Sequence, residues 1–224
     1  MLEHPKFQAR LTDEILAVPM EVVLRTTVDK MLPAIYDVFR GDCSGHGFSH
    51  ITRVFVNAMK IQKKEGGNAM VVGPAALVHD FHRARIFNHS NPNFGASEST
   101  PMVHEFLKRF EFPEKYIQPV LTCVAKHDDK NFVLNDQPVG LEIAIVRDAD
   151  IIDGIGIEGI LRQAAYMRSY GISAEEAFKF TSDEILNLKN RLQTQTAMIM
   201  SEERQKYMEK TIKHGIKIFE LLNY

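Results

Sequence analysis

A hydrophobic repeat of helical period runs through almost the whole chain, and it constrains the fold more than any other feature of the sequence. Apolar residues recur at three- and four-residue spacing, which places them on one side of an α-helix. The alternating pattern of a half-buried strand never persists beyond a few residues, so the chain is predicted to be all-α. Helices are expected over residues 21–39, 48–65, 74–81, 97–109, 113–126, 139–152, 157–170, 174–192 and 201–222.

Glycine, proline and asparagine separate these helices at short intervals, and no stretch has the composition of an interdomain linker. A length of 224 residues suits one domain with a substantial core. We therefore expect a single-domain helical bundle. Residues 81–96 are too polar and too rich in breakers for a helix, so we expect a loop that forms one wall of any site nearby.

Charge and cysteine content narrow the range of partners. The formal net charge is −2, which gives no basic field for a long nucleic acid, so we expect a small partner held by a local cluster. The two cysteines lack the spacing of a zinc finger and the density of a disulfide scaffold, which predicts free thiols and a cytoplasmic protein. Neither a signal peptide nor a membrane-spanning run is apparent, and we expect no membrane partner. Homodimer formation is left open.

The helix expected over residues 48–65 carries an apolar stripe with an unusual polar strip beside it. At about 100° per residue, His46, Arg53 and Asn57 project on one side of His50 and the apolar residues project on the other. A solvated face would be expected to carry lysine and glutamate, so the strip indicates a ligand site that borders the core. The alternative for His50 is a histidine at the core edge that bonds to a backbone carbonyl.

His79 and Asp80 end the apolar segment 74–78, which reads as a short buried helix with proline in its first turn. Adjacent helical residues project about 100° apart, so one cation over their shared edge can contact both side chains. Burial of a carboxylate is costly without such a cation. In the alternative interpretation the helix ends in solvent, with Asp80 exposed and His79 interacting with the helix dipole.

Asp150 lies in segment 141–153, which is apolar over most of its circumference, and it shares a face with Val146 and Asp153. We expect its carboxylate to be largely buried, and a buried carboxylate needs a cation or several hydrogen-bond donors. A metal ion would meet that need, and so would a salt bridge to Arg53 or Arg147.

Three segments, in this order along the chain, resemble the metal-binding segments of small bacterial hydrolases in the HD-domain metallophosphohydrolase superfamily. They are GHGFSHITRV at residues 45–54, AALVHD at residues 75–80 and RDADIIDGIG at residues 147–156. The resemblance spans roughly residues 28–170. It implies one HD-type domain over residues 1–224, with helices at 174–222 packed on the motif-bearing core. It also implies that His50, His79, Asp80 and Asp150 bind one divalent metal ion.

Two imidazoles and two carboxylates suit Mn²⁺, Mg²⁺, Fe²⁺, Co²⁺, Ni²⁺ or Zn²⁺, and ligand type does not choose among them. The resemblance implies a metal-dependent phosphohydrolase, in which a metal-activated water attacks the phosphorus of a small phosphate compound. A nucleotide is the favoured substrate, cleaved as by a nucleoside triphosphate pyrophosphohydrolase or a nucleotidase. Basic residues after Asp80 favour anhydride cleavage over monoester cleavage.

Further residues receive roles from this interpretation. Arg53 either contacts a substrate phosphate or holds a ligand carboxylate. His127 supplies either a base near the site or a phosphate contact, and the alternative is a simply exposed residue. For Arg83, Arg85 and Lys126 the alternative to phosphate contact is a solvated surface position. The predicted catalytic residues are Arg53, Asp80, His127 and Asp153, and the predicted substrate contacts are His46, Arg53, Arg83, Arg85 and Lys126.

The pattern departs from several relatives within the superfamily. Alarmone hydrolases and bacterial 5′-nucleotidases carry an acidic residue shortly after the His-Asp pair, whereas residues 81–85 are basic here, which disfavours both activities. The adjacent histidines of the two-metal phosphodiesterases are absent, although His89, His104 and His127 are present, so one metal ion is expected. The alternatives are a phosphodiesterase for cyclic nucleotides or other diesters, a diiron oxygenase with extra ligands from His104 or His127, and a noncatalytic binding module.

Overall fold

The computed structural model describes residues 5–84, 94–135, 138–173, 176–179 and 185–221, and these residues form helices and turns with no strand among them. The all-α prediction is confirmed for this part of the chain. The elements are α1 (Pro5–Leu16), α2 (Val22–Phe39), α3 (Phe48–Glu65), α4 (Ala69–Val78), the 3₁₀ turn η1 (Phe81–Arg83), α5 (Thr100–Arg109), α6 (Glu114–Lys126), α7 (Gly140–Asp153), α8 (Ile157–Ser169), the 3₁₀ turn η3 (Leu188–Arg191) and α10 (Gln195–Leu221).

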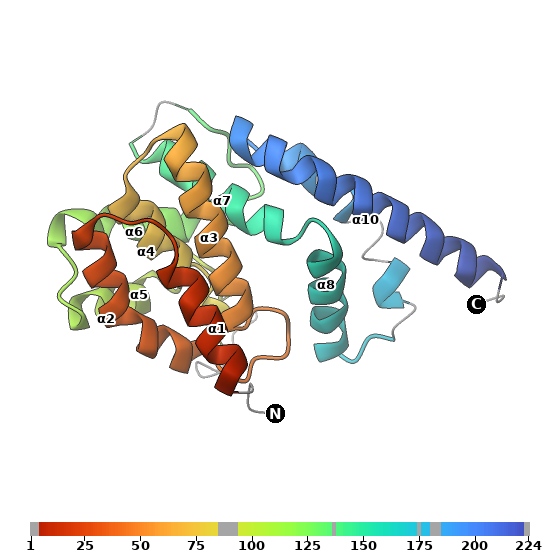
Figure 1. Ribbon diagram of the computed structural model, residues 1–224, viewed down its shortest axis with the longest axis horizontal. Coiled ribbons are helices and arrows are strands. Elements are labelled where there is room, and N and C mark those ends of the chain that lie inside the picture. The colour runs from red at the N-terminus through yellow and green to blue at the C-terminus, as the bar shows by residue number, and fades with distance from the viewer. Residues whose placement is uncertain (1–4, 85–93, 136–137, 174–175, 180–184, 222–224) are drawn as a thin grey trace.

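Helices α3, α4 and α7 form the centre of the molecule. Figure 1 shows α3 between α1 and α7, and α4 also packs on both α3 and α7. The apolar stripe predicted for residues 48–65 supplies fully buried Ile51, Val54 and Phe55 to this core. Burial of such side chains contributes roughly 1.5–3 kcal/mol each, so the stripe fixes which face of α3 points inward.

Helix α4 starts earlier than the sequence analysis predicted, at Ala69 instead of residue 74. The side chain of Asn68 caps it by accepting a hydrogen bond from the backbone N–H of Met70 at 3.0 Å. Residues 70–78 are all buried, so apolar residues cover its whole circumference and Pro74 lies inside the helix. The prediction was wrong because it used Pro74 as a start signal, although packing on every side outweighs the local cost of a proline.

The structure also differs from prediction near both ends of the chain. Helix α1 was not predicted, yet it buries Leu11 and Ile15 against the core. Helix α10 begins at Gln195 instead of residue 201, because Asp148 accepts hydrogen bonds from the backbone N–H groups of Gln193 and Thr194 just before it. The helix predicted over residues 174–192 is interrupted, since residues 188–191 form η3; residues 174–175 and 180–184 lie outside the described part.

This arrangement brings three helix termini to one place. His50 lies in the first turn of α3, His79 and Asp80 follow the end of α4, and Asp150 and Asp153 lie in the last turn of α7. Helix α10 packs on α3, α7 and α8. The boundaries of the motif-bearing core and of one domain over residues 1–224 stay predictions. No helix among the described residues has the length and apolarity needed to cross a membrane.

Candidate metal centre

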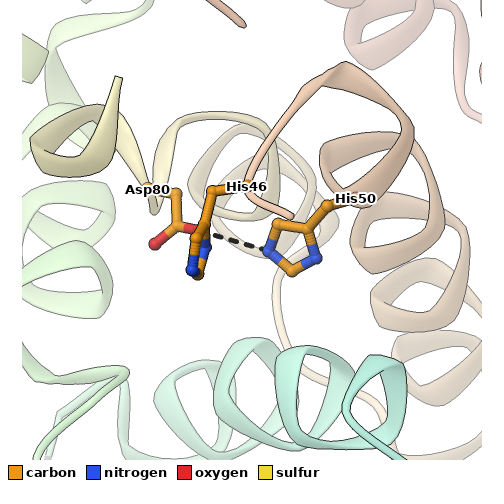
Figure 2. A group of neighbouring side chains, drawn as sticks. All are labelled: His46, His50 and Asp80. Atoms are coloured by element: carbon orange, nitrogen blue, oxygen red, sulfur yellow. Dashed lines mark hydrogen bonds and ion pairs between the residues drawn. The ribbon is translucent and has the colours of Figure 1, made fainter. Parts of the chain in front are cut away.

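The residues predicted as metal ligands meet at the junction of α3, α4 and α7. The Nε2 atom of His50 lies 3.2 Å from Nε2 of His79, 3.2 Å from Oδ2 of Asp80 and 3.5 Å from Oδ1 of Asp150. Figure 2 shows His46 and His50 directed toward Asp80. Ligand atoms within 4.8 Å of one another form three overlapping groups, which are His46, His50 and Asp80; His50, His79 and Asp150; and His79, Asp80 and His127.

Hydrogen bonds on the far side of each ring point the two central imidazoles into the cluster. His79 uses Nδ1 to bond the carbonyl of Ala76 at 2.9 Å, and His50 uses Nδ1 to bond Oδ2 of Asp153 at 2.7 Å. These bonds leave Nε2 of both rings facing the cluster. A hydrogen bond to a carbonyl or carboxylate on the other nitrogen is the usual way in which proteins orient a metal-binding histidine.

Burial and charge set the protonation of these groups. Burial lowers the pKa of His79 to about 3, so this imidazole is neutral and able to bind a metal at physiological pH. Burial and Arg162 both act to lower the pKa of His50, but Asp153 and Asp80 outweigh them and raise it. The neighbouring histidines hold the pKa of the Asp80 carboxyl well below its usual range despite burial. Asp80 is therefore a carboxylate, as a hard-metal ligand must be.

Asp150 differs from the sequence-based prediction in two respects. It was expected to be largely buried, but its side chain is 30% exposed. Neither arginine proposed as its salt-bridge partner contacts it. Arg53 bonds Asp153, and Arg147 donates to the carbonyls of His127 and Asp129. Among the described residues, His50 approaches Asp150 most directly, with Nε2 3.5 Å from Oδ1, and despite its partial burial the histidines of the cluster lower the pKa of the Asp150 carboxyl.

Asp153 is the fully buried carboxylate behind the cluster. Besides His50, it accepts hydrogen bonds from Nε and Nη2 of Arg53 at 2.5 and 3.0 Å. Arg162 of α8 places Nη1 3.0 Å from Oδ2 of the same carboxylate. Asp153 was predicted to be catalytic, and the structure places it where it orients His50. Arg53 was predicted to contact phosphate or hold a carboxylate, and here its guanidinium holds Asp153.

Arg162 is a site residue that the sequence analysis missed. It donates from Nε to the carbonyl of Gly45 at 2.7 Å, and its Nη2 lies 3.3 Å from Nε2 of His50. Gly45 has φ of +92°, and a Cβ there would meet the carbonyl oxygen of Arg162 at 2.9 Å, so this close approach requires glycine. The glycines at 154 and 156 were a usable signal, because they turn the chain sharply and bring the next helix back past the cluster.

His46 and Arg83 both bind Asp80. Nδ1 of His46 lies 2.7 Å from Oδ2 of Asp80, and Nε of Arg83 lies 3.2 Å from Oδ1. Both side chains also line a cavity of about 610 Å³ between residues 42–46 and α8. We call it the α8 cavity. It gives the cluster an adjoining space for a ligand of small-molecule size, and the predicted substrate contacts His46 and Arg83 lie at its inner end.

The other predicted residues vary in position. His127 is buried, its ring centroid lies 5.0 Å from that of His79, and its Nδ1 bonds the carbonyl of Val124. His104 is partly exposed beside Glu105, and Lys126 is exposed at the end of α6, so neither is placed in the cluster. Arg85 and His89 lie outside the described residues. Phosphate contact by Arg85 and Lys126 therefore stays a prediction.

The donor set fits a divalent metal ion. Two inward-facing imidazole nitrogens and two carboxylates, one of them partly exposed, offer a mixed nitrogen and oxygen site that borderline and hard ions accept. The cluster is consistent with the metal site of an HD domain. Metal identity and number are not fixed by these residues, because several first-row ions share this preference.

Comparisons with known proteins agree with this geometry. No protein-family model matches the chain. The uncharacterized protein YpgQ of Bacillus subtilis is 28% identical over 178 residues, which cover 78% of this chain and 84% of YpgQ. The crystal structure of an HD-superfamily hydrolase from Bacillus thuringiensis superimposes on this chain with a TM-score of 0.59. The two sequences are 25% identical, and the match covers 95% of this chain and 98% of that one. The chain belongs to the HD superfamily of hydrolases.

The crystal structure of YpgQ in complex with ADP has a similar fold, with a TM-score of 0.66 to this HD-domain protein. The two sequences are 26% identical, and the match covers 85% of this chain and 96% of YpgQ. The superfamily resemblance carried by the three sequence segments is thereby confirmed over most of the chain, together with the helical HD-domain fold.

Proposed function

We propose that this HD-domain hydrolase is a metal-dependent phosphohydrolase that acts on small phosphate compounds, with nucleotides as the substrate class. The observation that carries the proposal is the position of the cluster. Its His50, His79, Asp80 and Asp150 donors lie beside a cavity whose inner end carries Arg83. A metal-ligating cluster next to a cationic side chain suits a phosphate group better than an uncharged substrate. The ADP complex of the related YpgQ supports a nucleotide ligand.

His50, His79, Asp80 and Asp150 would hold the divalent ion. When bound, such an ion polarises a phosphoryl oxygen and lowers the pKa of a water molecule. The chain's own residues perform the positioning. Asp153 orients His50, and His46 binds Oδ2 of Asp80, the oxygen that also lies 3.2 Å from Nε2 of His50.

Arginines border this centre on two sides and can neutralise phosphate charge. Arg83 is 33% exposed and bonds Asp80 from the cavity side, so part of its guanidinium remains available to an anion. Arg162 approaches from α8 and is 16% exposed. Burial acts to lower the pKa of Arg83, but Asp80 outweighs it and raises this pKa, so Arg83 keeps its charge at every physiological pH. Two guanidinium groups suit the several charged oxygens of a phosphoanhydride.

An activity that uses two metal ions is the second candidate, and the position of His127 favours it. This buried histidine forms a ligand group with His79 and Asp80, as a second ion would require. A two-metal enzyme at this site would be a phosphodiesterase or a diiron oxygenase. His104, the other residue considered for the oxygenase, is partly exposed beside Glu105 and lies outside the groups of ligand atoms.

Metal-stripped protein, reloaded separately with Mn²⁺, Mg²⁺, Fe²⁺, Co²⁺, Ni²⁺ or Zn²⁺, tests the proposal against a substrate panel. The panel contains nucleoside tri-, di- and monophosphates, cyclic nucleotides and an aryl phosphodiester. We expect one ion per chain and release of phosphate or pyrophosphate from nucleotides. Release only from diesters would favour the phosphodiesterase, and two irons with oxygen consumption would favour the oxygenase. No hydrolysis of any panel member by metal-loaded protein would contradict the proposal.

A further inference from the structure

The α8 cavity extends away from the cluster toward a pair of tyrosines that the proposed hydrolysis leaves unexplained. Tyr166 and Tyr170 line it, with ring centroids 5.1 Å apart and an interplanar angle of 63°. The ring of Tyr166 also meets His46 edge-on, at 5.6 Å and 78°. Tyr170 is 68% exposed. Exposed aromatic side chains along a ligand-sized cavity are suited to contact a flat apolar group.

Helix α8 arranges its side chains in a definite order from the cluster outward. Arg162 reaches Asp153 and His50 at the inner end, Tyr166 follows one turn later, and Tyr170, the residue that caps the end of the helix, follows after another turn. Residues four apart lie on the same face of a helix, and the eight steps from residue 162 to residue 170 span about 12 Å. This face therefore runs from cation to aromatic rings over a distance comparable with an extended nucleoside polyphosphate.

Arg83 connects the two ends. It lines the α8 cavity and bonds Asp80 at 3.2 Å. Tyr170 lines the same cavity, so this cation and the aromatic ring border one space. A ligand in the cavity thus meets Arg83 toward the cluster and the two tyrosines, with Arg168 beside them, farther from it.

Side-chain hydroxyls around the cavity already have protein partners. Ser44 donates to Asp42 at 2.8 Å, Ser169 donates to the carbonyl of Tyr166 at 2.6 Å, and the hydroxyl of Tyr166 donates to that of Tyr170 at 3.3 Å. Asp42 additionally accepts from the backbone N–H of Ser44 at 2.8 Å. The O–H donors of Ser44, Ser169 and Tyr166 are thus used within the protein and are not free for the edge of a ligand ring.

We propose that Tyr166 and Tyr170 form the stacking surface for the base of a nucleotide whose phosphates point toward Arg83 and the His/Asp cluster. The assignment of the phosphate end rests on the proposed function. Stacking uses the face of the base, which every nucleobase has, whereas discrimination between bases needs hydrogen bonds to the base edge. The site therefore accepts purine and pyrimidine nucleotides with similar affinity.

Kinetics with and without a base on the substrate provide the first test. Tyr166→Ala and Tyr170→Ala in the metal-loaded enzyme should raise KM for ATP, GTP, CTP and UTP by roughly tenfold or more. Inorganic tripolyphosphate, which has no base, should be hydrolysed by Tyr170→Ala as by wild type. Tyr166→Phe keeps a ring and should restore KM. Tyr207→Ala, at an exposed tyrosine of α10 that is 64% exposed, is the matched control and should resemble wild type.

Two results would overturn the proposal. Unchanged nucleotide KM in both alanine variants would remove the stacking role. An equal loss of tripolyphosphate and nucleotide hydrolysis in Tyr170→Ala would show that the tyrosine supports the fold or the cluster. Tyr166→Ala alone does not decide this point, because Tyr166 contacts His46, which binds Asp80.

A binding measurement separates this proposal from the hydrolytic one. The triphosphate of 2-aminopurine riboside loses fluorescence when its base stacks, so we expect saturable quenching by metal-loaded wild type. The Tyr166→Ala, Tyr170→Ala double variant should lose the quenching. Quenching without hydrolysis would contradict the proposed function and leave the stacking surface intact. Hydrolysis without quenching would contradict the stacking surface and leave the proposed function intact.

Discussion

Nδ1 of His50 lies 2.7 Å from Oδ2 of Asp153, although 103 residues separate the two in the chain. The bond joins the first turn of α3 to the last residue of α7, and it leaves Nε2 of His50 facing Asp80 and Asp150. Asp153 is fully buried and also binds Arg53 and Arg162. This one carboxylate therefore sets the orientation of a central ligand and holds three helices together.

Asp153→Asn should weaken metal binding without removing a direct ligand. Asparagine keeps the size of the side chain but loses the charge, so the His50 imidazole is held less firmly and is less basic. Loss of such an outer partner usually costs about 10–100-fold in metal affinity. The apparent Kd, measured by competition with a chromophoric chelator, should rise by this factor, whereas Asp37→Asn at an exposed carboxylate should have no effect. Unaltered affinity in Asp153→Asn would show that His50 is oriented by other contacts.

Arg53→Ala should lower metal affinity together with turnover. The guanidinium binds Asp153 with two hydrogen bonds, and its loss frees the carboxylate that orients His50. We expect a smaller effect than in Asp153→Asn, about tenfold in Kd, because Arg162 still contacts the carboxylate. Arg53→Lys keeps the charge but not the paired geometry, so its apparent Kd should lie between those of the wild type and Arg53→Ala. Full metal content with a large loss of kcat would instead support direct contact between Arg53 and the substrate phosphate.

The two thiols should differ sharply in reactivity. Burial raises the pKa of the Cys123 thiol well above its ordinary value, whereas Cys43 is exposed and lines the α8 cavity. Because the thiolate is the reactive form, iodoacetamide at about pH 8 should label one thiol in the native protein and two after denaturation. An unfolded thiol ionises near its ordinary pKa, so the Cys123 contribution should destabilise the fold as pH rises above about 9. Mass spectrometry of labelled peptides measures the stoichiometry.

Nucleotide bound in the α8 cavity should also slow the labelling of Cys43. Protection by a nucleotide but not by inorganic phosphate would agree with a base lying near the cavity mouth. Labelling of Cys123 in the native state would contradict the buried environment described for α6.

The sequence predicted a helix well where its apolar residues form one regular face that packs on the core. The bounds of the helix at residues 48–65 were predicted correctly because its apolar stripe is wide and regular. The meeting of His50, His79, Asp80 and Asp150 could be anticipated only from the order of three segments and their resemblance to known hydrolases. No local pattern specifies which helix ends meet in space.

Other features depend on long-range packing and could not be predicted. The start of α4 depends on burial over its full circumference, so a local proline signal was misleading. The glycines at 154 and 156 signal that the chain turns back, but packing decides that Arg162 of the following helix then reaches the cluster, and it also places Tyr166 in α8 and Tyr170 just after it. Asp153 could be recognised as unusual from its apolar segment, but its partners lie on α3 and α8.

Asp150→Asn tests the central claim, a metal-dependent hydrolase built on this cluster, most directly. The substitution keeps the shape of the side chain and removes its charge, so a metal ligand loses much of its hold on the ion. The measurement is phosphate release from nucleoside triphosphates over a metal titration, with metal content and thermal melting recorded on the same samples. Asp37→Asn is the control, since Asp37 is an exposed carboxylate on α2.

The wild type and Asp37→Asn should bind about one ion per chain, hydrolyse the nucleotide and lose thermal stability when the metal is chelated, because the ion joins α3, α4 and α7. Asp150→Asn should hydrolyse the nucleotide more slowly by orders of magnitude, and chelation should change its melting temperature much less. Metal binding and turnover equal to wild type in Asp150→Asn would contradict the assignment of this cluster as the metal centre.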